Sequence, residues 1–291
     1  MSMALSDHFK DIFKRFDFIE AEMNEENAEK MFNVWSAKYA SCLKAADERK
    51  KMEMISRSVR ARREMMTSAY LWAEALTVKE QGCISAYYFL RYYSLFHAMW
   101  SVLFLNPEED KKLVEITHSK LKKVFCNYYA NYDYCAFNKD LVDFFESTQE
   151  YRETYSYNRP NNLIHIPDSE EKHEKALLIC YQLTNLFTSM LKRRVSLITI
   201  NSANREMLEE EFAFFNGHKE DDKYVYDPFE ENILYEMKKY GMSIIELEEV
   251  LGHDWDELGY NSTVRQAFDE DAVDKIKGKA ISFIFRAVPF A

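Results

Sequence analysis

Glycine and proline are scarce in this sequence, with 6 Gly and 5 Pro among 291 residues. Sheets with tight hairpins place these residues in their turns, so the shortage argues against an extensive β-structure. Hydrophobic residues make up 47% and charged residues 30%, values typical of a globular chain with a sizeable core. We therefore expect an all-α protein.

Cysteine pairs, cofactor motifs and a signal sequence are also lacking. The five cysteines include no CxxC, which is typical of reduced cysteines in a cytoplasmic protein. There is no P-loop, GxGxxG, HExxH or GxSxG, and the metal-capable side chains of GHDWD at 252–256 have no partner histidine nearby. The N-terminal MSMALSDHFKDIF has no apolar signal-peptide core. We expect no metal, no cofactor and a cytoplasmic location.

An excess of positive charge is missing too, because the formal net charge is −11. A large sequence-independent nucleic-acid surface needs clustered Lys and Arg, so the charge argues against such a surface but does not exclude a small local basic site. The densest basic stretch is RSVRARR, from Arg57 to Arg63. Two interpretations of it stay open: a solvated helix face, or a strip that contacts phosphates.

The stretch from Gly82 to Asn106, GCISAYYFLRYYSLFHAMWSVLFLN, predicts a long α-helix without proline. Its apolar and aromatic residues fall all round the helix, which predicts the buried central helix of a bundle. The polar exceptions, Arg91, Ser94, His97 and Ser101, fall within an arc of roughly 120° and need hydrogen-bonding partners. An arginine in the middle of the stretch argues against a membrane span.

Helical periodicity continues on both sides of this stretch and divides the chain into three regions. Residues 1–66 are expected to form an N-terminal helical extension, residues 67–199 a helical bundle, and residues 200–291 an acidic, mainly helical C-terminal region. One hypothesis for the acidic region is that it covers a basic groove. Its last apolar run, Ile281 to Val288, fits either a terminal strand or a core helix.

Three pieces of sequence carry a family resemblance. SAYYFLRYYSLFHAMWSVL, then THSKLKKVF, then FFESTQEYRETYSY follow one another in order. Together they resemble the HEPN superfamily of helical bundles, and most of all the small HEPN proteins whose central helix carries an AYYxxFHA-like signature. In those proteins the next helix opens with Thr-His and a later one ends in an Arg-x-x-x-aromatic pattern. The resemblance covers roughly residues 67–195 and implies a HEPN-like bundle.

The resemblance also implies a chemistry. Many HEPN proteins are metal-independent ribonucleases that use an Arg-x(4–6)-His motif, usually as dimers. Arg159 and His165 have this spacing, and the resemblance implies that Arg159 holds the scissile phosphate while His165 acts as general acid and base. The RNA 2′-OH would attack, leaving a 2′,3′-cyclic phosphate. Asn158 and Asn161 are supporting candidates, and the alternative is a polar loop with an incidental spacing.

A second pair with this spacing, Arg91 and His97, lies on the central helix. The alternative for it is an interhelical hydrogen-bond network, with Asp140, Asp143 or Glu150 as partners on a neighbouring helix. Arg152 is either a structural ion-pair residue or a second phosphate contact. His118, in the Thr-His pair, is expected to make a helix-start hydrogen bond.

Two functions from different classes follow. The first is a HEPN-type endoribonuclease, a bacterial toxin of a toxin–antitoxin pair or an anti-phage defence effector, acting on RNA as a homodimer. The second is a catalytically inert HEPN-type module that binds a nucleotide, an RNA or a partner protein such as a nucleotidyltransferase. The ribonuclease activity of many HEPN proteins and the position of His165 favour the first function. Pro160, directly after Arg159, and the negative net charge of the chain favour the second. Neither function involves a membrane.

Overall fold

The computed structural model describes residue 5 and residues 16–131, 134–157, 169–195, 202–220, 223–226, 231, 233–235 and 270–288. The prediction of an all-α protein is confirmed, because helices form almost all of the regular structure in this part of the chain. The elements in order are α1 (Asp17–Glu20), α2 (Glu25–Ala45), α3 (Glu48–Glu80), α4 (Ile84–Phe104), the 3-10 helix η2 (Lys111–Glu115), α5 (His118–Tyr129), α6 (Lys139–Tyr157), α7 (Glu170–Val195), α8 (Ser202–Asn216), the strands β1 (His218–Glu220) and β2 (Lys223–Val225), and α12 (Glu270–Ala287).

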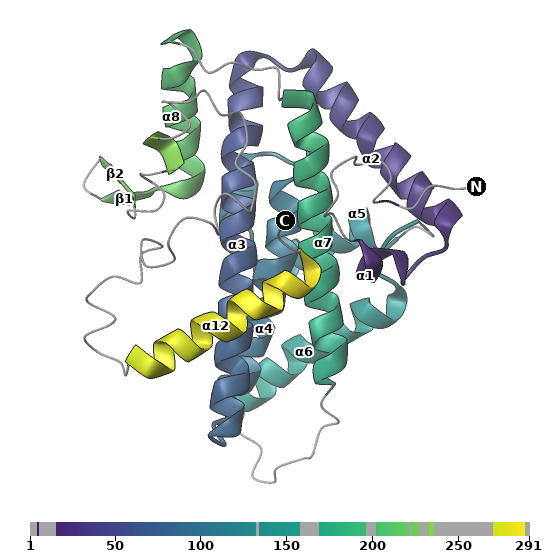
Figure 1. Cartoon of the computed structure of the whole chain (residues 1–291), viewed down its shortest axis with the longest axis vertical. Coiled ribbons are helices and arrows are strands. Elements are labelled where there is room, and N and C mark those ends of the chain that lie inside the picture. Colours follow the sequence, from purple (N-terminus) through teal and green to yellow (C-terminus); the bar gives the residue numbers. More distant parts are fainter. Residues whose placement is uncertain are drawn as a thin grey trace.

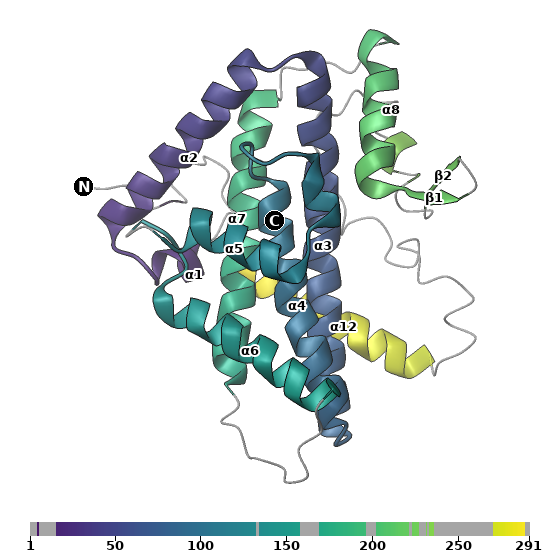
Figure 2. The same cartoon turned by 180° about the vertical axis from the view of Figure 1, so that it is seen from behind.

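The helices α3 and α4 form a long hairpin on which α5, α6, α7, α8 and α12 pack, whereas α1 and α2 pack mainly on α7 (Figure 1). The turn between them uses Gly82, whose φ of 78° lies in the left-handed region that favours glycine. Helix α7 runs beside the hairpin and α12 crosses it on one side, whereas α5 and α6 cover the opposite side (Figure 2). The strands β1 and β2 pair antiparallel next to α8.

The three predicted regions share one hydrophobic core. Helix α3 runs unbroken through the predicted boundary between residues 66 and 67. Side chains from both ends of the described chain, such as Trp35 of α2, Phe212 of α8 and Ile284 of α12, belong to the same buried cluster. Of the two interpretations of the last apolar run, the helix is the one observed, since Ile281–Ala287 lies within α12.

Helix α4 has a buried side and an exposed side, so it is not buried all round as its composition suggested. Ser94 meets His173 of α7 at 2.8 Å, Ser101 meets Thr184 of α7 at 2.8 Å, and Arg91 donates to the Ser169 carbonyl at 3.2 Å. These buried polar groups therefore find partners on or next to α7. Along the exposed side, a strip of apolar side chains stays partly accessible: Phe89, Leu90, Tyr93 and Trp100.

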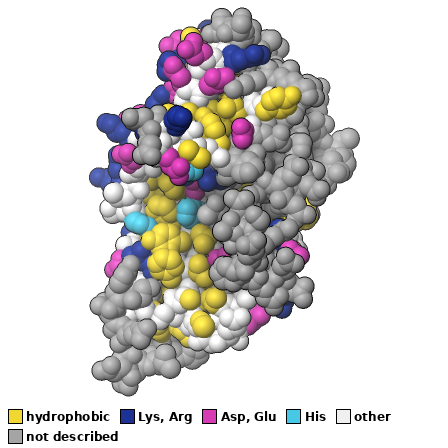
Figure 3. All heavy atoms as spheres, turned by 90° about the vertical axis from the view of Figure 1, so that its left-hand side faces the viewer, with side chains coloured by type: hydrophobic (Ala, Val, Ile, Leu, Met, Phe, Trp, Pro, Cys, Tyr) yellow, Lys and Arg dark blue, Asp and Glu magenta, His cyan; other side chains and the backbone are white. Residues whose placement is uncertain are grey.

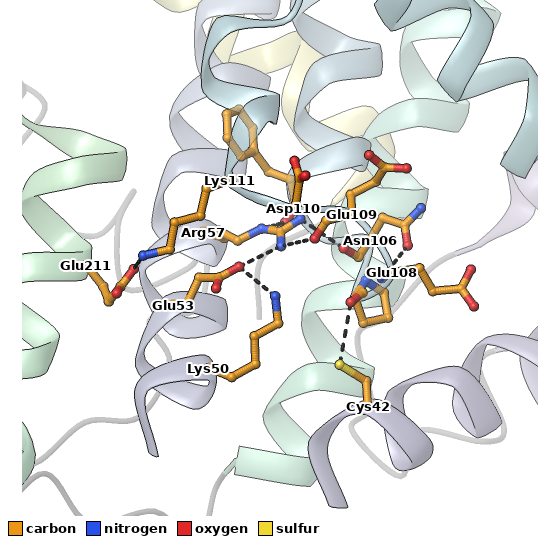
Figure 4. Close-up of polar contacts among 12 residues, drawn as sticks. Cys42, Lys50, Glu53, Arg57, Asn106, Glu108, Glu109, Asp110, Lys111 and Glu211 are labelled. Carbon is orange, nitrogen blue, oxygen red and sulfur yellow. Dashed lines mark hydrogen bonds and ion pairs between the residues drawn. The ribbon is translucent and has the colours of Figure 1, made fainter. Parts of the chain in front are cut away.

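The basic stretch of α3 is neither a solvated face nor a free phosphate strip. Arg57 is fully buried, and its guanidinium donates to the carbonyls of Phe104 at 2.7 Å, Asn106 at 2.9 Å and Glu109 at 3.0 Å (Figure 4). Glu53, one turn earlier on α3, pairs with the same guanidinium at 3.1 Å. A helix leaves its last carbonyls without intrahelical donors, so Arg57 completes the C-terminal end of α4.

The acidic helix α8 lies against the same stretch of α3. Arg60 and Arg63 of α3 donate to the carbonyls of Phe215 and Asn216 at 3.2 and 3.1 Å. Buried Glu211 of α8 pairs with Lys111 of η2 and with Arg49 of α3, the latter at 3.1 Å. Part of the acidic region therefore lies against basic side chains, and these arginines are engaged within the protein. The hypothesis that the region covers a basic groove stays a prediction.

We expect Arg57→Met to lower the free energy of unfolding by about 3–5 kcal/mol, because it leaves several buried carbonyls without a donor and removes one partner of Glu53. Urea unfolding followed by circular dichroism measures this change. The matched control is Arg286→Met in α12, whose half-exposed pair with Glu174 is expected to contribute less than about 1 kcal/mol. Equal losses in the two variants would contradict the structural role of Arg57.

Candidate functional site

The first predicted pair, Arg159 and His165, lies outside the described residues, together with its supporting residues Asn158 and Asn161. The interpretation of this pair as a catalytic site stays a prediction. The other predicted residues, Arg91, His97 and Arg152, lie within the described helices α4 and α6.

Arg91 and His97 contact different parts of the bundle. The buried Arg91 guanidinium lies over the rings of Phe144 and Tyr87, 5.4 and 5.7 Å from their centroids, and reaches the start of α7. His97 instead turns to α3, where its partner is Glu64 and not one of the three predicted carboxylates on α6. His97 follows Arg91 by six residues, and at about 100° per residue the two side chains point in directions about 120° apart around the helix. This angle explains why they contact different helices.

Glu64 holds His97 in a fixed orientation. One carboxylate oxygen lies 2.5 Å from His97 Nδ1, and the other lies 2.5 Å from Arg60 Nε. Burial raises the pKa of Glu64, but the hydrogen bond from His97 and the positive charge of Arg60 outweigh burial and keep this pKa below its usual value. An ionised carboxylate only accepts, so Nδ1 of His97 carries the hydrogen and Nε2 is the nitrogen left to exchange a proton with a ligand.

His118, at the first position of α5, packs on two aromatic rings that His97 also contacts. Its ring centroid is 4.6 Å from that of Phe96 and 5.5 Å from that of Tyr93, and both of these rings also contact His97. Nδ1 of His118 lies 2.7 Å from the Tyr92 hydroxyl. Burial lowers the pKa of His118, and the positive charges of Arg152 and His97 lower it further. His118 is therefore a neutral proton acceptor at pH 7.

Arg152 of α6 completes this group. Its guanidinium lies over the Tyr92 ring at 4.6 Å from the centroid and over the Tyr93 ring at 5.9 Å. It also pairs with Glu153 at 3.4 Å. The Tyr92 ring therefore contacts both the guanidinium of Arg152 and the imidazole of His118, which stacks on it with ring centroids 5.5 Å apart. We call the four residues Glu64, His97, His118 and Arg152 the histidine cluster.

The histidine cluster reaches the surface beside the exposed side of α4. His97 and His118 are each partly exposed, and the apolar strip with Phe89 and Tyr93 continues from them along the helix. Figure 3 shows histidine side chains at the edge of such a strip of hydrophobic side chains, with Lys or Arg side chains nearby. A ligand can therefore meet cationic, proton-exchanging and apolar groups on one face.

The sequence reasoning identified part of this cluster and missed the rest. His97 is predicted as a partner of Arg91, and Arg152 as an ion-pair residue or a second phosphate contact with either Arg–His pair. His118 was expected to make only a helix-start hydrogen bond, although the Thr-His pair in the family-like signature is a signal that could have selected it. Glu64 carries no such signal, because it lies 33 positions before its partner.

Comparison of the chain with family models, curated proteins and solved structures finds no match. None of the described helices combines the length and apolar character of a membrane span. In the part of the chain that the structure describes, no three His, Cys, Asp or Glu side chains lie together as a metal site would need.

The pH dependence of stability tests the buried histidine behind α4. Burial lowers the pKa of His173 far below its ordinary value of 6.5, and the Arg91 charge adds to this effect. As the pH falls through about 6.5, His173 binds a proton in the unfolded chain but not in the folded one. His173 therefore lowers the stability of the protein at pH values below about 6.5. We expect the unfolding free energy to drop between pH 7.5 and pH 5.5 by about 1 kcal/mol more in the wild type than in His173→Gln.

Urea unfolding at the two pH values measures this difference. Glutamine can keep a hydrogen bond to Ser94 but does not titrate, so the difference between the two proteins reports the protonation of His173 alone. His118 has a pKa lowered in the same direction and contributes equally in both proteins. An identical drop in the two proteins would show that His173 does not titrate on unfolding.

Proposed function

We propose that this protein is a HEPN-type, metal-independent endoribonuclease, of the kind found in toxin–antitoxin pairs and anti-phage defence. The resemblance of residues 67–195 to the HEPN superfamily supports the class. The histidine cluster supports the chemistry, and one observation is the main support: two partly exposed imidazoles, His97 and His118, pack on the same aromatic rings, and the guanidinium of Arg152 lies over one of these rings, that of Tyr93.

The proposed reaction divides the acid and base roles between the two imidazoles. Neutral His118 takes the proton from the ribose 2′-OH, and the oxygen attacks the adjacent phosphorus. His97, in its protonated form and held by Glu64, gives a proton to the departing 5′-oxygen. The guanidinium of Arg152 stabilises the charge that grows on the phosphoryl oxygens. The products are a 2′,3′-cyclic phosphate and a free 5′-hydroxyl, so the protons balance without a metal.

Arg159 and His165 are the alternative site for the same reaction. In a homodimer, as the resemblance implies, this pair or the histidine cluster would act next to its copy. Arg152 precedes Arg159 by seven residues along the chain and is the one supporting residue that both sites share.

We expect His97→Gln and His118→Gln each to lower RNA cleavage in EDTA by about a hundredfold or more, because each removes one of the two proton transfers. The measurement is a single-turnover assay on a labelled RNA, with the product ends analysed for cyclic phosphate. His218→Gln is the matched control, since His218 lies exposed on β1 and outside the cluster.

Three outcomes of this assay separate the alternatives. Loss in the two cluster variants, with full activity in His218→Gln, supports the histidine cluster. Loss only in His165→Ala moves the reaction to Arg159 and His165. The absence of cleavage by the folded wild type would overturn the nuclease proposal.

Glu64→Gln tests the positioning role of Glu64. Glutamine keeps the shape but removes the charge that stabilises a protonated His97, so we expect cleavage to fall about tenfold with KM little changed. The split between kcat and KM is the readout, and a rise in KM with kcat unchanged would contradict the role.

The second candidate function is an inert HEPN-type module that binds a nucleotide, an RNA or a protein such as a nucleotidyltransferase. The exposed apolar strip on α4 favours it, because Phe89 is 39% exposed and its ring contacts that of Tyr93, with centroids 4.6 Å apart and an interplanar angle of 44°. Exposed aromatic rings are typical of surfaces that bind bases or partner proteins. RNA binding without cleavage in the assay above would favour this function.

A further inference from the structure

A pocket, here called the aromatic pocket, lies between α2, α5 and the turn that follows α4, and it has no residue in common with the histidine cluster. Its volume is about 520 Å³. Three aromatic side chains, two carboxylates and one lysine form most of its wall: Trp35, Tyr128, Tyr134, Glu108, Glu109 and Lys38. The combination of ring faces and carboxylates is typical of sites that bind organic cations.

The aromatic wall is fixed by the core behind it. Trp35 is buried and stacks on Tyr129, with ring centroids 5.2 Å apart and an interplanar angle of 17°. It also contacts Phe187 of α7 at 4.8 Å. Tyr128 lies 6.3 Å from Trp35 at an angle of 54°, so the two rings meet as adjacent walls. Binding at these rings would therefore need little rearrangement of the backbone.

The aromatic walls already hold ammonium groups of the chain itself. Lys38 Nζ lies 4.6 Å from the ring centroid of Trp35 and 5.2 Å from that of Tyr128. Lys30 Nζ lies 5.0 Å from the ring centroid of Tyr134. These distances are within the range of cation–π attraction. All three rings thus present their faces to positive charge.

The carboxylates add a negative field. Glu108 pairs with Lys38 at 2.7 Å. Burial, followed by a hydrogen bond to Glu109 and the charges of Glu109 and Glu108, raises the pKa of Tyr128 to about 12. The lining itself carries two negative charges and one positive charge, and Lys30 lies beside Tyr134 as a second cation, so a ligand cation that takes the place of Lys38 keeps the favourable field of Glu108 and Glu109.

We propose that this pocket binds an organic ammonium ion, and that Lys38 is a built-in competitor for the same rings and for Glu108. The volume of about 520 Å³ is present with Lys38 in place, since Lys38 is part of the wall. Alkylated ammonium ions are weakly hydrated and interact well with ring faces, whereas small inorganic cations are strongly hydrated and prefer oxygen ligands. This inference does not depend on the proposed ribonuclease activity.

Choline and its neutral isostere 3,3-dimethylbutan-1-ol test the proposal, because they share a shape and differ in charge. Isothermal titration calorimetry on the full chain is expected to give weak, saturable binding of choline and at least about tenfold weaker binding of the isostere. Lys38→Met removes the competitor and keeps an apolar stem, so we expect it to tighten choline binding about tenfold.

Variants of the wall complete the test. Tyr128→Leu should weaken choline binding about tenfold, and Tyr134→Leu provides the same test should Tyr128→Leu fail to fold. Tyr224→Leu is the matched control, since Tyr224 is exposed on β2 and is expected to leave binding unchanged. Equal binding of choline and the isostere, or no saturable binding of choline to the folded wild type and Lys38→Met, would overturn the proposal.

Discussion

The buried guanidinium of Arg57 is the contact on which much of the arrangement depends. It binds the carbonyls that end α4 and those of the turn beyond it, so α3, α4 and that turn are fixed by one side chain. The geometry suits arginine, whose five donors can serve several acceptors at once. Because the same turn carries Glu108 and Glu109, Arg57 also positions the carboxylates of the aromatic pocket.

Helix α4 organises the rest of the bundle through its separate faces. One face hydrogen-bonds to α7 through serines, a second meets α3 through His97 and Glu64, and a third is the exposed apolar strip. Polar contacts on the buried faces specify which helix lies where, since apolar packing alone tolerates other arrangements. The histidine cluster forms where the second and third faces meet.

The all-α fold could be predicted because helical periodicity and the shortage of turn residues are properties of short stretches of sequence. The environment of Arg57 could not, since its main partners are backbone carbonyls 47 to 52 positions away, and every residue offers a carbonyl. The pairing of Glu64 with His97 depends on the register of the α3–α4 hairpin, which the pattern of α4 alone does not determine. The Arg-x(4–6)-His spacing known from the HEPN resemblance identifies His97 as a candidate, but it carries no information on Glu64, the residue that pairs with it.

Arg60 links two parts of the molecule that are distant in sequence. Its guanidinium holds the carboxylate of Glu64 on one side and the carbonyl of Phe215, near the end of α8, on the other. A ligand that orders His97 would therefore also favour the docked position of α8, and a partner that pulls α8 away would loosen His97. Any coupling between the two contacts is reciprocal in free energy, so α8, which lies in the acidic region, and the histidine cluster are linked through one shared cation.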